Sequence, residues 1–252
     1  MIAIDLSGKV ALVTGATGQL GRAMVRTLAQ AGADIVIHYH ENAGKAESLV
    51  AELNQLERKV LAVQADVTER DSVNEMQRHV ESSVGSPDIV VANAVIQYDW
   101  KEVLQQSPSD YESQFRSCVL QSVLLTQAFV PGMMTRKWGR VIGVNTECSM
   151  QCARGQSAYV SGKRGMDGVF RVLAREVGEY DITVNQVAPG WTISEDRCES
   201  DSTHAYRENV PLKRRGTDRE IAHVVAFLAS DLAGFISGAY IPVCGGNVMP
   251  GI

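Results

Sequence analysis

Residues 10–23 read Val10-Ala-Leu-Val-Thr-Gly-Ala-Thr-Gly-Gln-Leu-Gly-Arg-Ala23, and this stretch decides the fold of the chain. Its first four residues are an apolar run typical of a buried strand, and helix-forming residues follow through Gln30. Between them, glycines at 15, 18 and 21 allow a sharp turn and a close backbone approach to a pyrophosphate. Free N–H groups and the positive end of the following helix dipole attract the same anion. The stretch therefore predicts a nucleotide-binding loop, with a purely structural strand-to-helix turn as the alternative.

Short apolar runs and helical patterns alternate along the rest of the chain. We expect strands at residues 10–13, 33–39, 60–64, 87–92, 140–145, 182–187 and 239–243. We expect one helix that ends at Gln30 and five more over residues 42–58, 68–84, 110–137, 156–179 and 217–230. Thr68 and Thr217 are the expected caps of the helices that begin at them. Because strands that alternate with helices imply right-handed crossovers, the expected fold class is α/β, a parallel sheet of about seven strands with helices on both faces.

Charge and composition limit the classes of partner. The formal net charge is −5 with the two signs interspersed, and the pI is about 5.6, which argues against a basic face for nucleic acid. No basic segment followed by an apolar core opens the chain, and no apolar run approaches the roughly 18 residues that a membrane span needs. We therefore expect a cytoplasmic protein with no nucleic-acid partner and no membrane partner.

The cysteines are expected to be reduced thiols. They stand at positions 118, 148, 152, 198 and 244, an odd number in a chain too long to need disulfides. Cys148 and Cys152 lie four positions apart, but no second Cys or His pair follows at the spacing of a zinc site. The sequence accordingly predicts no metal site.

The residues that directly follow the expected strands are candidates for a binding site. A ligand of such a sheet binds at the carboxyl ends of the strands, where the strand order reverses. These positions are Thr14 to Gly21, Tyr39, Asp66, Asn93, Thr146 and Pro189. The segment 191–212 is polar and weakly periodic, so we expect it to form a flap beside the site.

The stretch Tyr159-Val-Ser-Gly-Lys163 places a phenol and an ammonium on one face of an expected helix. A free tyrosine has a pKa of about 10, and a nearby cation favours the phenolate and lowers that pKa. Tyr159 is then a candidate proton donor to a carbonyl oxygen that receives hydride, or acceptor from an alcohol that loses it. Taken alone, the same spacing also occurs on solvated helix edges.

A family resemblance rests on motifs that occur in one order along the chain: Thr14-Gly-x-x-Gly-x-x-Gly21, Asp66-Val67, Asn93-Ala94, Tyr159-x-x-x-Lys163, Asn185-x-Val-Ala-Pro-Gly190, Pro211-Leu-Lys-Arg-Arg-Gly216 and Gly245-Gly246. In these motifs the chain resembles the short-chain dehydrogenase/reductase family over essentially its whole length. The resemblance implies a Rossmann-like, doubly wound parallel sheet in a single NAD(P)-binding domain, residues 1–252, with a substrate flap at 191–212. It also implies an NAD(P)-dependent oxidoreductase that transfers a hydride between the nicotinamide and an alcohol or carbonyl substrate.

The resemblance implies roles for individual residues. It makes Tyr159 the catalytic acid/base and Lys163 the residue that bonds the nicotinamide ribose and tunes Tyr159, with Thr146 at the position of the family's substrate-orienting serine. The resemblance also implies that four parts of the chain bind the cofactor. They are the glycine-rich turn, the end of the second strand, a set of residues near the adenine and its ribose, and a set near the nicotinamide. These are Gly15, Thr17, Gly18, Gln19, Leu20, Tyr39, His40, Asp66, Val67, Asn93, Ala94, Pro189, Gly190 and Thr192.

The chain departs from the family pattern at several of these places. Cys118 stands where the family has an asparagine that supports a proton-relay water, and a thiol is a poor substitute for an amide. Val95 and Gln19 replace glycines, and Cys244 replaces a common aspartate. Either the site is tuned to an unusual substrate or rate, or the chain is a catalytically degenerate dinucleotide-binding protein with a regulatory or structural role. Because both Tyr159 and Lys163 remain, we favour the enzyme.

The choice between NAD and NADP stays open in the sequence, with a lean to NADP. NAD binders usually offer a carboxylate after the second strand to the ribose 2′-hydroxyl, whereas NADP binders offer donors to a 2′-phosphate. Here Tyr39 occupies that position between His38 and His40, Glu41 is close, and Gly18 stands where an arginine is usual. Histidines can donate to a phosphate, and the alternative is that both are merely exposed loop residues.

The substrate and the assembly are only broadly indicated. A 3-oxoacyl thioester, a sugar-like polyol and a secondary alcohol all fit, and a lyase or dehalogenase on the same scaffold is a weaker alternative. Tyr98 and Trp100 either stack on a substrate or pack against the domain, and residues 147–154 are expected to form another wall. Family resemblance suggests a homotetramer or homodimer through the helices that begin at Asp110 and Gln156, which carry apolar residues on more than one face.

Overall fold

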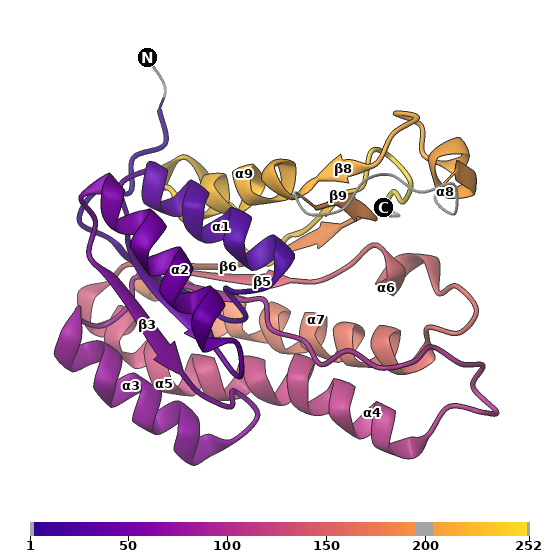
Figure 1. Cartoon of the computed structure of the whole chain (residues 1–252), viewed down its shortest axis with the longest axis horizontal. Helices are drawn as coiled ribbons and strands as arrows, with labels where there is room; N and C mark the ends of the chain where they lie inside the picture. The colour runs from indigo at the N-terminus through magenta and orange to yellow at the C-terminus, as the bar shows by residue number, and fades with distance from the viewer. Residues whose placement is uncertain (1–2, 195–203, 251–252) are drawn as a thin grey trace.

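A single seven-stranded parallel sheet organises the computed structural model, which describes residues 3–194 and 204–250 (Figure 1). The strands stand in the order β3-β2-β1-β4-β5-β6-β9. Their bounds are β1 Val10–Val13, β2 Asp34–Tyr39, β3 Val60–Gln64, β4 Ile89–Ala92, β5 Gly139–Val144, β6 Ile182–Pro189 and β9 Tyr240–Val243. The predicted α/β, Rossmann-like doubly wound fold is confirmed.

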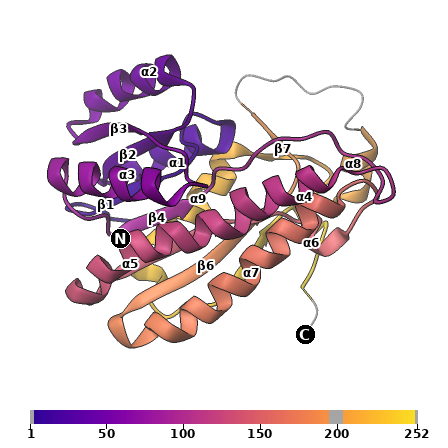
Figure 2. The ribbon, with the colours of Figure 1, turned by 90° about the horizontal axis from the view of Figure 1, so that it is seen from below.

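The helices cover both faces of this sheet. They are α1 Gln19–Gln30, α2 Ala43–Leu53, α3 Arg70–Ser83, α4 Pro108–Gln114, α5 Gln121–Arg136, α6 Cys148–Gln151, α7 Ser157–Val177, α8 His204–Asn209 and α9 Asp218–Ala229. Figure 1 shows α1 and α9 above the sheet, and Figure 2, which is seen from below, places α3, α4, α5 and α7 in front of it. The strands β1, β4, β5 and β6 are therefore buried, whereas the edge strands β3 and β9 are only partly buried.

The strand order reverses next to β1, and this position determines where a ligand can bind. The register pairs Leu12 of β1 with Val36 of β2 on one side and with Val90 of β4 on the other. The chain winds outward from β1 through β2 to β3, then returns to β4 and winds the other way. The loops after β1 and β4 consequently diverge and leave a crevice at the carboxyl ends of the strands.

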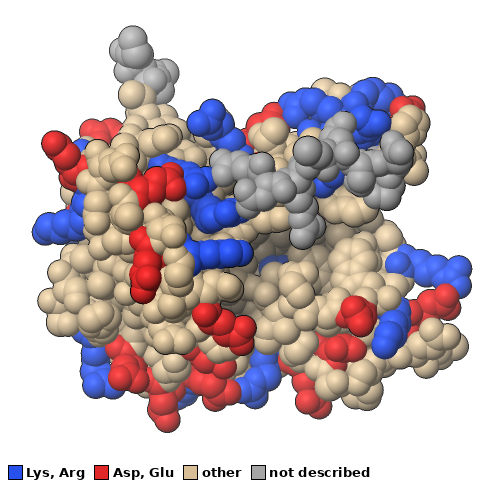
Figure 3. Space-filling view, viewed as in Figure 1, with Lys and Arg blue, Asp and Glu red and all other residues tan. Residues whose placement is uncertain are grey.

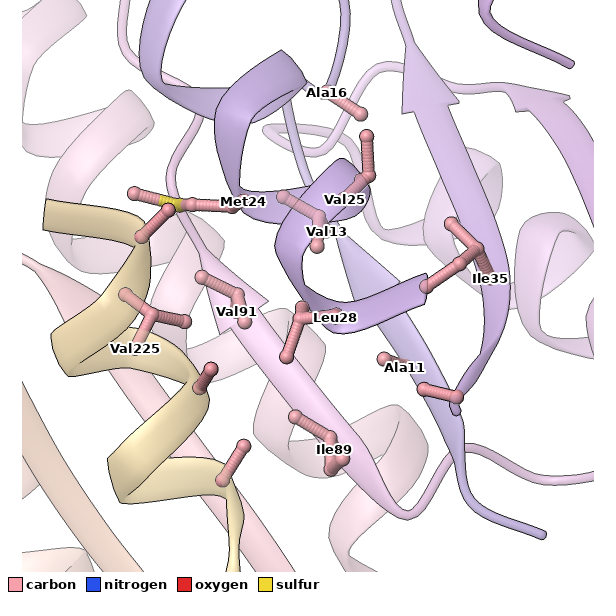
Figure 4. Packing of buried hydrophobic residues seen from close by; sticks show 14 of the residues in the cluster. Ala11, Val13, Ala16, Met24, Val25, Leu28, Ile35, Ile89, Val91 and Val225 are labelled. Carbon is pink, nitrogen blue, oxygen red and sulfur yellow. The ribbon is translucent and has the colours of Figure 1, made fainter. Parts of the chain in front are cut away.

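The alternation of side chains along β1 divides the core into two layers. Ala11 and Val13 face a cluster that includes Leu28 of α1 and Val225 of α9, as Figure 4 shows. Val10 and Leu12 face the other cluster, where α3, α5 and α7 pack. Because β1 is wholly buried, the loop that leaves it starts from a rigid position.

Two sequence predictions about helices need correction. Thr68 does not cap α3, because its N–H and hydroxyl both donate to Asp66 Oδ1, at 2.8 and 2.7 Å, and the helix begins two residues later, at Arg70. The helix expected over 110–137 starts at Pro108, with Ser107 as its cap, and a π-helical turn over Phe115–Leu120 separates α4 from α5.

Within residues 3–194 and 204–250, one helical run is long and apolar enough by composition to cross a membrane. It consists of α4, the π-helical turn and α5. Of its apolar window 56% is buried, and its parts pack against α3 and α7. A core helix of a globular protein has the same properties, and this run occupies such a position between the sheet and its neighbours.

The segment 191–212 is described only in part, since residues 195–203 lie outside the described residues. Its first residues form the short strand β7, Thr192–Ile193, which pairs with β8, Gly216–Thr217. Its last part contains α8. A small second sheet therefore stands beside the carboxyl end of β6.

Helix α9, which packs against α1, begins with the capping box that the sequence predicts. Thr217 Oγ1 accepts from the Glu220 N–H at 3.2 Å, and Glu220 Oε2 accepts from the Thr217 N–H at 2.8 Å. Thr217→Ala should lower the free energy of unfolding by about 1 kcal/mol, because two N–H groups lose their paired arrangement. Thr217→Ser should retain most of it. Urea titrations of both variants check this, and an unchanged midpoint for Thr217→Ala would show that the box contributes nothing.

Candidate active site

The first cavity lies in the crevice beside β1 and has a volume of about 710 Å³. Its walls come from the glycine-rich turn, from the ends of β2 and β3 and from the loop after β4. The predicted residues among its lining are Gly15, Thr17, Gly18, Gln19, Leu20, His40, Asp66, Val67, Asn93 and Ala94. The structure thus brings most of the predicted cofactor-binding residues to one cavity.

Glycine is required at two positions of the turn. Gly15 has a φ of +61°, and a Cβ there would lie 3.0 Å from the Ala94 Cα. A Cβ on Gly21 would lie 2.3 Å from the Gly15 carbonyl oxygen. The turn is therefore a compact backbone loop that larger residues would push apart.

Thr14 fastens the loop after β4 to the turn after β1. Its hydroxyl accepts from the N–H groups of Asn93, at 2.9 Å, and Ala94, at 3.0 Å, and donates to Gln121 Oε1 at 2.7 Å. The Asn93 amide returns a hydrogen bond to the Thr14 carbonyl at 2.8 Å. Gln121, on α5, also donates to the Ala94 carbonyl at 2.8 Å. Nothing in the sequence pattern indicated that Gln121 completes this network.

His38 supports the same turn from below and is only 1% exposed. Its Nδ1 lies 3.0 Å from the Gly15 nitrogen and accepts that N–H, so Nε2 carries the proton and donates to the Ala65 carbonyl at 3.0 Å. Burial lowers the pKa of His38 to about 4. Both interpretations of His38 as an exposed residue or a phosphate donor are therefore wrong, because its ring is neutral at pH 7 and both nitrogens are engaged.

The two residues that follow His38 point to different sides, as successive side chains of a strand do. His40 is exposed and lines the first cavity. Tyr39 packs against the core cluster on the α1 side and is not among the residues that line this cavity. The sequence pattern did not reveal this division, because β2 is buried on both faces and carries no polar alternation.

A second cavity of about 380 Å³ adjoins the first. The two share Leu20, Asn93, Val95, Ile96 and Gln97. The predicted residues that line the second cavity are Asn93, Leu20, Thr146, Tyr159, Lys163, Pro189 and Gly190. Thr192 does not line either cavity and pairs with Gly216 in the small sheet. Figure 3 shows a hollow across the same face of the molecule.

The three predicted catalytic residues meet in the second cavity. A hydrogen bond joins the Thr146 hydroxyl to the Tyr159 phenol, and the same Thr146 oxygen accepts from the Cys148 N–H at 3.2 Å. The Tyr159 ring stacks on Trp100 with a centroid distance of 6.2 Å. Lys163 Nζ donates to the Val144 carbonyl at 2.6 Å and lies 5.8 Å from the centre of the Tyr159 ring. Two hydroxyls therefore face one space that a carbonyl oxygen can enter.

The electrostatics of Tyr159 differ from the sequence prediction. Burial raises the pKa of the Tyr159 phenol well above its usual value, and the nearby thiols of Cys148 and Cys118 act in the same direction. The expected lowering by Lys163 is absent in this structure because the ammonium points at the Val144 carbonyl. Tyr159 is protonated at pH 7 and is ready to donate.

Asn145 positions the turn that carries Thr146. Its Oδ1 accepts from the Thr146 N–H at 2.9 Å, and its Nδ2 donates to the Lys163 carbonyl at 3.0 Å and to Gln186 at 2.7 Å. Tyr240 on β9 donates to the Thr146 carbonyl. Sequence reasoning missed Asn145 because an amide at the end of an apolar run has no distinctive spacing.

The departures from the family pattern leave both cavities open. Val95 lines both of them, and Gln19 lines the first. Cys118 is 1% exposed within the π-helical turn. Beside it, Ser117 lines the first cavity, and its hydroxyl has no hydrogen-bond partner among the described residues. Cys244 is buried against the backbone of Val248.

The second cavity has a roof that the sequence did not specify beyond a flap. Trp191 and Tyr206 line it, and the Trp191 N–H donates to the Tyr206 hydroxyl at 2.8 Å. Tyr206 lies on the short helix α8, inside a polar stretch without periodicity. In the part of the chain that the structure describes, no group of three or more His, Cys, Asp or Glu residues is arranged to hold a metal ion.

The buried state of His38 has a measurable consequence for stability. Its folded pKa of about 4 lies below the ordinary value of 6.5, so the unfolded chain binds more protons between these pH values. Stability should fall as the pH drops from about 6.5 to 4, by up to about 3 kcal/mol from this group. Urea unfolding of the native chain and of His38→Asn at several pH values tests this. Parallel pH profiles for the two proteins would contradict it.

Comparisons with known proteins agree with this geometry. The family model described as enoyl-(acyl carrier protein) reductase matches residues 15–247. The 3-oxoacyl-[acyl-carrier-protein] reductase FabG of Pseudomonas aeruginosa is 38% identical over 251 residues, which cover 98% of this chain and 100% of that protein. The protein of the same name from Staphylococcus epidermidis is 35% identical over 243 residues, 96% of this chain and 99% of that one.

Solved structures extend the likeness to the whole fold. A blue fluorescent protein from a metagenomic library, in complex with NADPH, has a TM-score of 0.90 and 30% identity over 97% of this chain and 100% of that chain. A Serratia marcescens short-chain dehydrogenase/reductase mutant has a TM-score of 0.89 and 29% identity over 96% of this chain and 98% of that chain. The reversal of strand order, the glycine-rich turn and these relatives together show that the chain belongs to the short-chain dehydrogenase/reductase family.

Proposed function

We propose that this protein is an NAD(P)-dependent oxidoreductase that transfers a hydride between a nicotinamide and an alcohol or carbonyl substrate. The observation that carries the proposal is the pair of hydroxyls, Thr146 and Tyr159, in the cavity that adjoins the crevice beside β1. One cavity has the backbone of a dinucleotide site, and the other has a proton donor. The relatives named 3-oxoacyl-[acyl-carrier-protein] reductase support reduction of a carbonyl group.

The residues present fit a dinucleotide. The turn at Gly15 and Gly21 admits no Cβ without a clash, so its backbone N–H groups can approach a pyrophosphate at the start of α1. Asp66 and Val67 would contact the adenosine half, and Asn93 with Ala94 would lie beside a ribose. Lys163 would bond the nicotinamide ribose, and the carboxyl end of β6 would face the nicotinamide through Pro189 and Gly190.

The nicotinamide supplies or accepts the hydride when it is bound. In reduction, the substrate's carbonyl oxygen accepts hydrogen bonds from Thr146 and Tyr159. As the C–H bond forms and the carbonyl π bond breaks, this oxygen takes the phenolic proton of Tyr159. In oxidation the proton returns to Tyr159 as the C–H bond breaks. Tyr159 is protonated at pH 7, which is the form that reduction requires.

NADP suits the first cavity better than NAD. His40 and Asn42 line it where the adenosine ribose would lie, and both side chains can donate to a 2′-phosphate. Figure 3 shows basic side chains beside the hollow on this face. The solved relative bound to NADPH supports the same choice. Glu41 also lines the cavity but is largely exposed, so it presents a solvated carboxylate.

The protein is further proposed to be a cytoplasmic homotetramer or homodimer. Phe115, beside α4, and Val172, on α7, are 56% and 55% exposed, although α4 and α7 pack together within one chain. Association of two chains through these helices would bury the rings and branched side chains. Light scattering at micromolar concentration should give two or four times the 27.4 kDa chain mass. A monomer mass would contradict the proposed assembly.

Tyr159→Phe tests the proposed chemistry directly. It removes the proton donor and keeps the ring that stacks on Trp100, so kcat should fall about 10²- to 10⁴-fold while NADPH still binds. The matched control is Tyr111→Phe, since the Tyr111 phenol bonds Ser157 on the same helix, outside both cavities. NADPH oxidation with a panel of ketones is followed by absorbance.

Two results would overturn the proposal. Full activity in Tyr159→Phe would remove the role of its phenol, whereas stoichiometric NADPH binding without turnover of any carbonyl compound would favour the degenerate dinucleotide-binding protein.

A further inference from the structure

The second cavity contains a carboxylate that the proposed hydride transfer does not use. Glu147 directly follows Thr146, lines the same cavity and is only 3% exposed. Its N–H donates to the Pro189 carbonyl at 3.0 Å, which holds the backbone against the end of β6. The acid therefore shares one cavity with the hydroxyls of Thr146 and Tyr159.

Among residues 3–194 and 204–250, the groups that hold the Glu147 carboxylate are neutral. Asn247 Nδ2 donates to Oε2 at 3.0 Å, and the hydroxyl of Tyr206 and the N–H of Trp191 donate as well. Among the residues that the structure describes, no Lys or Arg forms an ion pair with it. The cation in the same cavity, Lys163, donates to the Val144 carbonyl instead.

A buried carboxylate without a cationic partner is costly, and a positively charged ligand removes that cost. Consistent with this, burial raises the pKa of Glu147 while its three donors oppose the shift. A plain acyl chain in the cavity would exclude water from the acid and offer it no hydrogen bond. The acid is therefore poorly suited to an apolar substrate and well suited to a cation.

Five aromatic side chains line the same cavity. Tyr98, Trp100, Tyr159, Trp191 and Tyr206 all line it. Aromatic faces attract an ammonium group, and a carboxylate within such walls is a common way to bind one. Two independent features, charge and ring content, thus point to the same ligand chemistry.

We propose that the substrate carries a protonated amine near its reacting carbon, and that Glu147 is the residue that selects it. The protein would then interconvert an amino alcohol and an amino ketone, which rests on the proposed oxidoreductase function. In oxidation, a bound nicotinamide would accept the hydride of the carbinol C–H bond, and the phenolate form of Tyr159 would take the hydroxyl proton and pass it to solvent. The ammonium group keeps its proton and is held by Glu147.

The test uses two alcohols that differ in one atom pair. In 1-(dimethylamino)propan-2-ol the branch point is a protonated nitrogen, and in 4-methylpentan-2-ol it is a C–H carbon. With NADP⁺, kcat/KM for the amine should exceed that for the isostere by about 10- to 100-fold. In Glu147→Gln, which keeps the size of the side chain, the ratio should fall close to one. Because the ratio compares two substrates of the same protein, a general loss of activity lowers both kcat/KM values equally and leaves the ratio unchanged.

The matched control is Glu102→Gln, because Glu102 is an acid that pairs with Arg154 on the surface and does not line the second cavity. It should keep the amine preference of the native protein. Equal kcat/KM for the two alcohols in the native protein, or a preference that survives Glu147→Gln, would overturn the inference. The same holds if Glu147→Gln lowers both values in proportion, since Glu147 then only holds the roof residues in place.

A binding measurement separates this inference from the proposed function. Both alcohols are titrated calorimetrically into protein saturated with NADPH, where no turnover occurs. Tighter binding of the amine that is lost in Glu147→Gln supports the inference even if neither alcohol is oxidised, in which case the oxidoreductase function fails alone. Equal binding of both alcohols contradicts it.

Discussion

The close contact between the turn after β1 and the loop after β4 is the constraint on which the rest of the site depends. The Thr14 hydroxyl joins the two through the N–H groups of Asn93 and Ala94, and the backbone at Gly15 comes so near Ala94 that no Cβ fits. His38 holds the same turn from the β2 side. Since Thr14 and His38 are almost fully buried, the crevice has rigid walls before any ligand arrives.

This constraint also connects binding to chemistry. The loop after β4 continues through Val95 to Gln97, and these residues form the shared border of the two cavities. On the far side of the border, Asn145 fixes the Thr146 turn to α7, which carries Tyr159 and Lys163. A dinucleotide in the first cavity would therefore meet a substrate in the second next to two hydroxyls. Glu147 adds a negative charge to the lining of the second cavity.

Much of this structure could be predicted from the sequence, for identifiable reasons. The strands at 10–13 and 60–64 have the predicted bounds because each is a short apolar run between turn residues. The capping box at Thr217 was visible because its two partners are three residues apart in the sequence. The meeting of Thr146, Tyr159 and Lys163 in one cavity could be predicted because Tyr159 and Lys163 share a helix and Thr146 follows a strand.

The remaining features depend on contacts that local patterns do not contain. When a strand is buried on both faces, its sequence pattern does not show on which face each side chain lies. For this reason His38 was not expected inside, and Tyr39 was expected in the cavity. Thr68 bonds Asp66 rather than capping a helix, a competition that spacing cannot resolve. The direction of the Lys163 ammonium and the partners of Glu147 depend on distant segments, including Asn247 near the C-terminus.

The most direct test of the account is a pair of calorimetric titrations of the purified, cofactor-free protein with NADPH and with NADH. The account predicts one binding site per chain, with tighter binding of NADPH, because the crevice is held open by buried contacts and lined by donors at His40 and Asn42. Failure of a folded protein to bind either nucleotide would contradict it, since the cavity beside β1 would then have a purely structural origin.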